Sequence, residues 1–242
     1  MADIDRVLDG IIAAHGGAEF WHGLKDIEAV LSADGFLFTT KRRSPLRRMR
    51  VRAETRVPHF TFYDYPRAGL RGEWIGDDEV RIVDEAGAVV ARREHPRAAF
   101  RGLRRQFYWD DLDFLYFAGY ATWNYLTLPF IFLRLGFEFE LLPAAPGGVV
   151  RLRAAFPPDI PTHSRSQVFH FAPNGHLLRI DYTAEVVGGW ARAAHLCEHY
   201  RNFEGLQAPT RRRVRPLFGR EEPLAFPTLV AIDIHELRPL RC

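Results

Sequence analysis

Cysteine is scarce in this 242-residue sequence. Its two cysteines, Cys197 and Cys242, are too few and too irregularly placed to predict a disulfide framework, which favours a reducing compartment. A chain of this length can bury enough apolar surface to fold without a disulfide or a structural metal. The N-terminus carries Asp3 and Asp5 and no basic segment before its apolar positions, so it does not resemble a secretory signal. We therefore expect a cytoplasmic protein.

Lysine is also nearly absent, since the basic residues are 31 arginines and 2 lysines. The isoelectric point of about 9.0 would suit a nucleic-acid-binding protein, because arginine pairs well with phosphate. However, 30 acidic residues offset the 33 basic ones and leave a net charge of only +3. This balance is typical of a mixed, solvated surface, so no nucleic-acid partner is predicted.

Charge is missing altogether from residues 114–133, a run long enough to span a membrane as a helix. Asn124 and Pro129 lie inside this run, and a central proline breaks the helical hydrogen-bond ladder where lipid offers no replacement partner. The flanking segments have the pattern of β-strands. We therefore predict one or two helices, broken near Pro129 and packed on a sheet, with no transmembrane span. Peripheral contact of this block with a membrane or a partner protein stays open as an alternative.

Charged residues alternate strictly with small or apolar residues over residues 48–56, where every even position is charged. This period of two predicts a strand with one buried and one solvated face. Further short segments of strand composition are separated by Gly-, Pro- and Asp-rich turns. These segments are 26–40, 59–65, 70–76, 79–84, 88–94, 137–142, 149–156, 168–182 (a hairpin), 211–217 and 227–237.

Helices are predicted at fewer places. Residues 3–14 carry an apolar stripe and are followed by Gly16 and Gly17, which terminate helices well. Short helices are expected at 19–23 and around 188–200. The sequence therefore predicts an α+β, mainly β fold: a curved antiparallel sheet, or half-barrel, with an N-terminal helix and central helices as a lid. No repeat or linker divides the chain, so we expect one domain over residues 1–242.

This order of elements resembles the LolA/LolB-like lipoprotein carriers. The resemblance rests on the N-terminal helix ending in Gly16-Gly17, the short helix ending near Trp21 to Gly23, and the long meander that follows. It implies an incomplete antiparallel barrel closed by helices, with an apolar cavity for a lipid-like ligand. Residues 167–213 also resemble a group of bacterial proteins with no assigned function. The absent signal peptide and lipidated cysteine argue against periplasmic lipoprotein transport.

Aromatic residues are concentrated in the charge-free block. Helical spacing places Tyr116, Tyr120 and Trp123 along one stripe, and such stripes belong to a protein core more often than to a ligand site. The number of hydroxyl and indole donors nevertheless suits a pocket with apolar walls and a few polar groups. We predict that these three residues, together with Phe130 and His163, bind a hydrophobic ligand.

A β-hairpin is predicted around Asn174-Gly175, because both residues tolerate the positive φ of a two-residue turn. The expected register pairs Phe171 with Leu178 and places His170 and Asp181 diagonally on one face. An aspartate that orients a histidine is a common general-base arrangement, although a polar surface cluster explains the pair as well. The pair lies on the face opposite the phenylalanines, which favours ligand binding over catalysis.

His195 and His199 occur in the spelling H-x-x-E-H, which is found in one class of zinc proteases. Two histidines four residues apart share a helical face, but those proteases need a further acidic ligand from a later helix, and the sequence after Leu206 is strand-like. A metal-binding or proton-transfer role for some of the histidines remains an alternative, and we predict no metal site.

The sequence thus favours a protein that binds a hydrophobic or lipid-like small molecule in an aromatic cavity. The alternative is a cofactor-independent or metal-assisted enzyme, such as a cyclase, isomerase or hydrolase, that uses His170, Asp181, His195 and His199. No phosphate-binding loop, nucleophile elbow or dinucleotide fingerprint occurs, so no cofactor is predicted. The oligomeric state does not follow from the sequence.

Overall fold

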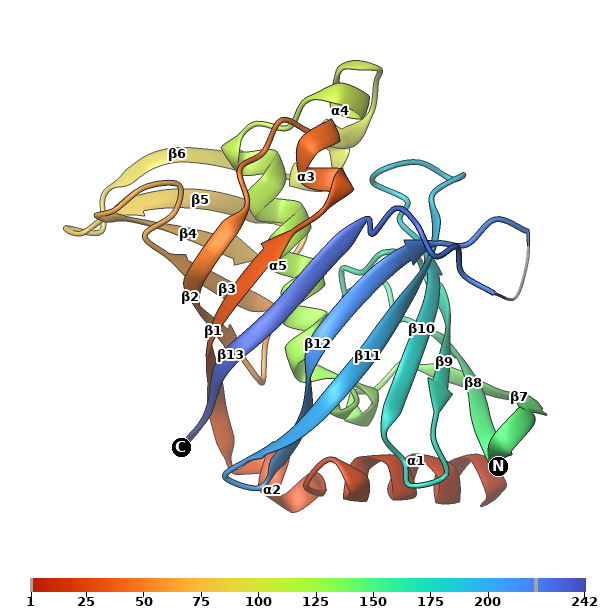
Figure 1. The fold of residues 1–242 in the computed structure, drawn as a ribbon. Coiled ribbons are helices and arrows are strands. Elements are labelled where there is room, and N and C mark those ends of the chain that lie inside the picture. The colour runs from red at the N-terminus through yellow and green to blue at the C-terminus, as the bar shows by residue number, and fades with distance from the viewer. Residues whose placement is uncertain (1, 220–221) are drawn as a thin grey trace.

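A thirteen-stranded, wholly antiparallel sheet forms the body of the protein in a computed structural model that describes residues 2–219 and 222–242 (Figure 1). The strand order is β6-β5-β4-β3-β2-β1-β13-β12-β11-β10-β9-β8-β7. β1 and β13 pair in the middle, whereas β6 and β7 are edges, so the sheet curves without closing. The predicted mainly β half-barrel is confirmed.

Most strands are joined to their neighbours by short connections. Their bounds are β1 (Leu24–Asp34), β2 (Leu46–Glu54), β3 (His59–Tyr63), β4 (Leu70–Ile75), β5 (Glu79–Asp84), β6 (Val89–Glu94), β7 (Glu138–Ala145), β8 (Val149–Ala155), β9 (Ser166–Phe171), β10 (Leu177–Thr183), β11 (Arg192–Phe203), β12 (Leu206–Pro216) and β13 (Val230–Arg241). The helices are α1 (Ala2–Ala14), α2 (Ala18–His22), α3 (Phe36–Thr40), α4 (Arg104–Phe107) and α5 (Asp111–Thr127), with 3-10 turns η1 (Pro96–Phe100), η2 (Phe130–Leu133) and η3 (Pro146–Gly148).

The helix α5 crosses the inside of the curved sheet and packs on β2 to β5 (Figure 1). Asp110 and Asp113 form a capping box at its start, and it ends at Thr127, two residues before Pro129. Its contact with the sheet is close because Gly119 lies on Trp74: a Cβ at position 119 would sit 2.6 Å from the tryptophan Cβ. No helix in the described part of the chain is long and apolar enough to cross a membrane.

The two ends of the half-barrel differ in their coverings. α1 and α2 lie at one end, whereas α3, α4 and the β10–β11 and β12–β13 loops lie at the other (Figure 1). Trp21 of α2 stacks on Phe130 of η2 with ring centroids 4.5 Å apart, so the chain that leaves α5 is fixed at the α1–α2 end. At the opposite end, residues of α3 and of the β10–β11 and β12–β13 loops border a cavity.

The predicted strand over residues 26–40 is wrong in its second half. β1 stops at Asp34, and Gly35 begins the helix α3 with a φ of 133°. A Cβ at Gly35 would approach the carbonyl oxygen of Leu229 to 2.5 Å, so only glycine fits against this neighbouring backbone. The amides of Phe36 and Leu37 donate to the carbonyl oxygens of Thr228 and Leu229, which turns the chain out of the sheet here.

The predicted helix over residues 188–200 is also wrong, because β11 occupies Arg192–Phe203. Its side chains alternate: His195 and Cys197 are buried, whereas Leu196 and Glu198 are partly exposed. Pairing with β10 on one side and β12 on the other satisfies its backbone, which outweighs the local helix pattern.

The β9–β10 hairpin forms as predicted with one change at its tip. His170 pairs with Arg179 and Phe169 with Ile180, but Phe171 pairs with Leu177 instead of Leu178. The amide of Gly175 donates to Ala172 O (2.8 Å), and Gly175 has a φ of 85°. This is a longer turn with a glycine bulge, and the bulge shifts the register by one residue.

Candidate functional site

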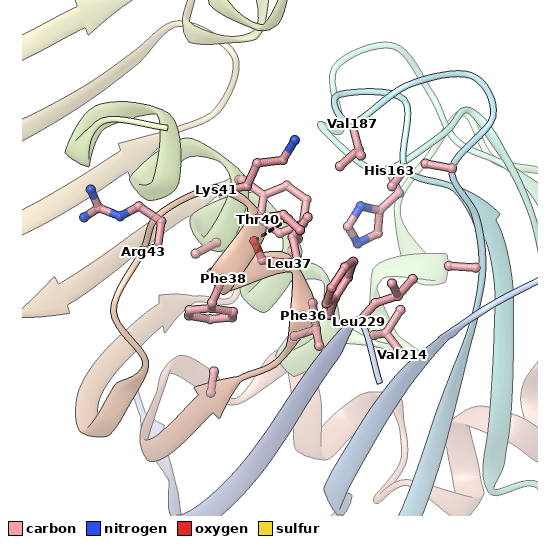
Figure 2. Close-up of a pocket in the computed structure, with 18 of the residues that line it drawn as sticks. Phe36, Leu37, Phe38, Thr40, Lys41, Arg43, His163, Val187, Val214 and Leu229 are labelled. Atoms are coloured by element: carbon pink, nitrogen blue, oxygen red, sulfur yellow. Dashed lines mark hydrogen bonds between the residues drawn. The ribbon is translucent and has the colours of Figure 1, made fainter. Parts of the chain in front are cut away.

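A cavity of about 550 Å³ lies at the end of the half-barrel that α1 and α2 leave uncovered. Its walls come from α3, from one face of α5, and from the central and C-terminal strands β1, β11, β12 and β13 (Figure 2). Among the described residues its lining is dominated by apolar side chains, including Leu31, Phe38, Val214 and Ile232. A pocket of this size and character suits a small hydrophobic molecule.

The face of α5 that lines the cavity carries Phe114, Phe117, Ala118, Ala121 and Tyr125. These positions are three or four residues apart, so they share one side of the helix. The two alanines leave open space between the aromatic rings, which therefore border the cavity without filling it.

Under the apolar walls lies a polar cluster centred on His163, which is buried and lines the cavity (Figure 2). Its Nδ1 lies 3.0 Å from the hydroxyl of Tyr120 and its Nε2 lies 2.6 Å from that of Tyr125. The ring of Tyr182 stacks on the imidazole with centroids 4.1 Å apart. Burial, followed by the charge of Arg97, lowers the pKa of His163 to about 3. The imidazole is therefore neutral near pH 7, with both nitrogens engaged.

The charged side chains that line the cavity are all cationic among the residues described: Lys41, Arg43 and Arg192. The Lys41 ammonium is buried and donates to the carbonyl oxygens of Gln106 (2.6 Å) and Arg105 (3.1 Å). It forms no ion pair with a described carboxylate, and burial lowers its pKa. Arg43 is held by Asp111, with Nη2 and Oδ1 2.5 Å apart. The cavity therefore carries positive charge that its own lining does not neutralise.

The sequence placed five residues at the ligand, and one of them, His163, lines the cavity. Tyr116 and Trp123 lie on another face of α5: the Tyr116 hydroxyl donates to Asp77 (2.5 Å), and Trp123 donates from Nε1 to the carbonyl of Glu54 (2.8 Å). Both are thus packed between α5 and the sheet, away from the cavity.

The other two predicted aromatics also lie outside the lining. The Tyr120 hydroxyl contacts Nδ1 of His163, but Tyr120 itself does not line the cavity. Phe130 stacks on Trp21 near the opposite end of the molecule. The physical reason is that α5 is buried on nearly every side, so an aromatic stripe does not reveal which face borders the cavity.

His170 and Asp181 form the predicted pair, with Nε2 and Oδ2 3.0 Å apart. Arg179 donates from Nε to the same carboxylate (2.5 Å). Burial alone would raise the pKa of Asp181, but hydrogen bonds from His170 and Arg179 hold it below its ordinary value. These side chains lie on the outer face of the sheet, because their inward neighbours Phe169 and Ile180 are buried.

His195 lies on the inner face, since it pairs with Ile180 of β10, while Asp181 pairs with Ala194. Its ring packs edge-on against Tyr125 with centroids 4.4 Å apart, and neither nitrogen has a hydrogen-bond partner among the described residues. His199 is exposed at an irregular position of β11 with a φ of 57°. The four proposed catalytic residues are thus divided between two faces and do not form one site.

No group of three or more His, Cys, Asp or Glu side chains in the described ranges could hold a metal ion.

The lining residues that the sequence did not predict come mainly from α3, the segment before α5, and β11 to β13. A sequence signal existed for α3, where the apolar Phe36-Leu37-Phe38 lies three residues before Lys41. The strand residues gave no such signal, because every buried strand face looks alike before its partners are known.

Two solved structures match this chain over most of their length. A LolA superfamily protein from Nitrosomonas europaea is 12% identical, with a TM-score of 0.51, and the match covers 96% of this chain and 92% of the other. A DUF1329 family protein from Desulfovibrio piger is 14% identical, with a TM-score of 0.51 and coverages of 97% and 92%. No family model and no curated protein sequence matches the chain.

At this level of identity the comparison defines the fold, and the fold is LolA-like. The predicted resemblance to LolA/LolB-like proteins is therefore confirmed for the architecture.

Proposed function

We propose that this protein binds one hydrophobic, lipid-like molecule in the cavity between α5 and the central strands. The observation that carries the proposal is the cavity itself, about 550 Å³ bordered mainly by apolar and aromatic side chains. The LolA-like fold supports it, because proteins of this architecture are suited to hold a hydrophobic ligand inside the half-barrel.

We further propose that the ligand carries an acidic head group. The charged lining residues Lys41, Arg43 and Arg192 are all cationic, and Lys41 is buried without a carboxylate partner among the described residues. An anionic group near the ammonium would neutralise a desolvated charge, and hydrogen bonds to charged groups contribute about 1.5–3 kcal/mol each. The apolar tail would then extend between α5 and the strands.

A catalytic function has weaker support. His163 is the histidine that lines the cavity, but its nitrogens already contact two tyrosine hydroxyls and its pKa is about 3. A general base for reactions near pH 7 needs a free acceptor and a pKa near that value. His170 and Asp181 have the geometry of such a pair, but they lie on the outer face of the sheet.

The test compares palmitic acid with cetyl alcohol, which share a chain length and differ in charge, by displacement of a fluorescent probe. We expect both to bind and the acid to bind about tenfold more tightly, as one charged hydrogen bond predicts. The variants Lys41→Met and Arg192→Gln should weaken the acid and leave the alcohol unchanged, whereas Arg211→Gln on β12 should affect neither. If a variant binds both ligands equally more weakly, the substitution has damaged the cavity. If the wild type binds neither palmitic acid nor cetyl alcohol, the proposed function is refuted.

A further inference from the structure

The open end of the cavity is surrounded by large apolar side chains that face solvent. Phe36, Leu103, Phe107, Trp190, Phe218 and Phe226 are between 52% and 82% exposed, and we call them the rim cluster. They include every phenylalanine and tryptophan found exposed in the described ranges. Exposed aromatic side chains gathered at one end of a molecule mark a contact surface.

The rim cluster comes from four segments that are distant in sequence. These are α3, the segment with α4, the β10–β11 loop and the β12–β13 loop, which lie together at the end opposite α1 and α2 (Figure 1). Phe36, Phe107, Trp190 and Phe218 also line the cavity. The exposed apolar surface and the cavity opening are therefore one continuous feature.

The same segments carry exposed positive charge. Arg42, Arg101, Arg104 and Arg192 are exposed, and none forms an ion pair with a carboxylate in the part of the chain that the structure describes. Arginines elsewhere in the fold are often paired, as Arg93 is with Asp110 and Asp113. Unpaired arginines beside exposed aromatics form a surface complementary to anionic head groups.

We propose that the rim cluster and its arginines dock the protein on an anionic phospholipid bilayer, with the cavity opening toward the lipid. Tryptophan and phenylalanine enter the boundary between head groups and acyl chains, and arginine contacts the anionic heads. The proposal rests on the proposed function in one respect: a ligand with an apolar tail can pass from the bilayer to the cavity without crossing water.

This contact differs from the one that the sequence left open. The charge-free block 114–133 is buried in α5 and η2, so it is not available to a membrane. The residues that are available lie in the loops and short helices at the cavity opening. A protein partner is the other occupant that such a surface could take, and the experiment distinguishes the two.

Sedimentation with lipid vesicles tests the proposal on the full chain. We expect binding to phosphatidylcholine vesicles that contain about a quarter phosphatidylserine, much weaker binding to pure phosphatidylcholine, and loss of binding when salt rises from about 0.1 M to 1 M. The triple variant Arg42→Gln, Arg101→Gln, Arg104→Gln should bind the anionic vesicles about a hundredfold more weakly, since each arginine near the surface contributes about fivefold.

The apolar contribution is tested by Leu103→Asp with Phe226→Asp, two rim residues that do not line the cavity. Vesicle binding should fall at least about tenfold, as expected when apolar side chains no longer enter the interface. The control is Leu135→Asp, which replaces a leucine that is 95% exposed just after η2, near the α1–α2 end. This variant should bind vesicles as the wild type does.

Ligand affinity in vesicle-free solution separates this proposal from the proposed function. The Leu103→Asp, Phe226→Asp variant should keep the wild-type affinity for palmitic acid. A wild type that binds palmitic acid but no vesicles would overturn membrane docking alone and indicate a protein partner. Vesicle binding without ligand binding would overturn the proposed function alone. Equal loss in the Leu135→Asp control would also refute docking through the rim.

Discussion

Acid should destabilise this protein through its buried histidines once the pH falls below about 6.5. His163 has an ordinary pKa of 6.5 in the unfolded chain, and burial lowers the pKa to about 3 in the folded protein. Between pH 6.5 and about 3, His163 therefore binds a proton in the unfolded chain but not in the folded protein. Stability is unaffected above pH 6.5 and falls as the pH decreases toward 3.

The size of this effect follows from the gap between the two values. A pH of about 5 lies about 1.5 units below the pKa of the unfolded chain, and each unit corresponds to about 1.36 kcal/mol. Neutral, buried His163 therefore lowers the unfolding free energy by about 2 kcal/mol at this pH. His15 behaves similarly, because burial lowers its pKa to about 4. Natural domains have about 5–15 kcal/mol of stability in total, so even one such histidine is measurable.

Urea unfolding followed by tryptophan fluorescence at about pH 7.5 and pH 5 provides the assay. The loss of unfolding free energy between these pH values should be about 2 kcal/mol smaller in His163→Gln than in the wild type, and likewise in His15→Gln. His199→Gln is the matched control, because that side chain is exposed in the folded protein. If His163→Gln and His15→Gln both lose as much stability as the wild type, the buried-histidine reasoning is refuted.

Two further predictions concern the packing of α5. Gly119→Ala should lower the unfolding free energy by about 1–3 kcal/mol because its Cβ meets Trp74, whereas Gly10→Ala, with open space around it, should be neutral or stabilising. Asp113→Asn should cost about 2–3 kcal/mol, because it leaves two arginines without their buried carboxylate, whereas Glu140→Gln in an exposed pair should change stability by less than about 1 kcal/mol. Thermal and urea unfolding would measure both, and equal effects in variant and control would contradict them.

Strands were the most predictable part of the fold. Alternation over residues 48–56 corresponds to β2 at Leu46–Glu54, and Pro129 ends the central helix where expected. These signals are local, since they depend on the period of the side chains and on the geometry of proline. The predicted register of the β9–β10 hairpin is confirmed for the pairs within the two strands. It is wrong at the turn, where Gly175 adds a bulge.

The cavity lining was much less predictable, because it depends on which buried face has no partner. Tyr116 and Tyr125 are both buried on α5, yet Tyr125 borders the cavity and Tyr116 contacts Asp77. The motif around His195 and His199 looked like a helical pair because the spacing suits a helix. This segment is instead the strand β11, because it pairs with β10 and β12. A local sequence pattern does not indicate such long-range partners.

Native mass spectrometry of the protein incubated with palmitic acid tests the central claim most directly. We predict one bound molecule per wild-type chain and none in Ala118→Trp, where an indole would occupy the cavity beside α5. Leu135→Trp places the same side chain at an exposed position and should bind as the wild type does. Circular dichroism would confirm that both variants are folded. Binding by folded Ala118→Trp equal to that of the wild type would contradict the assignment of this cavity as the ligand site.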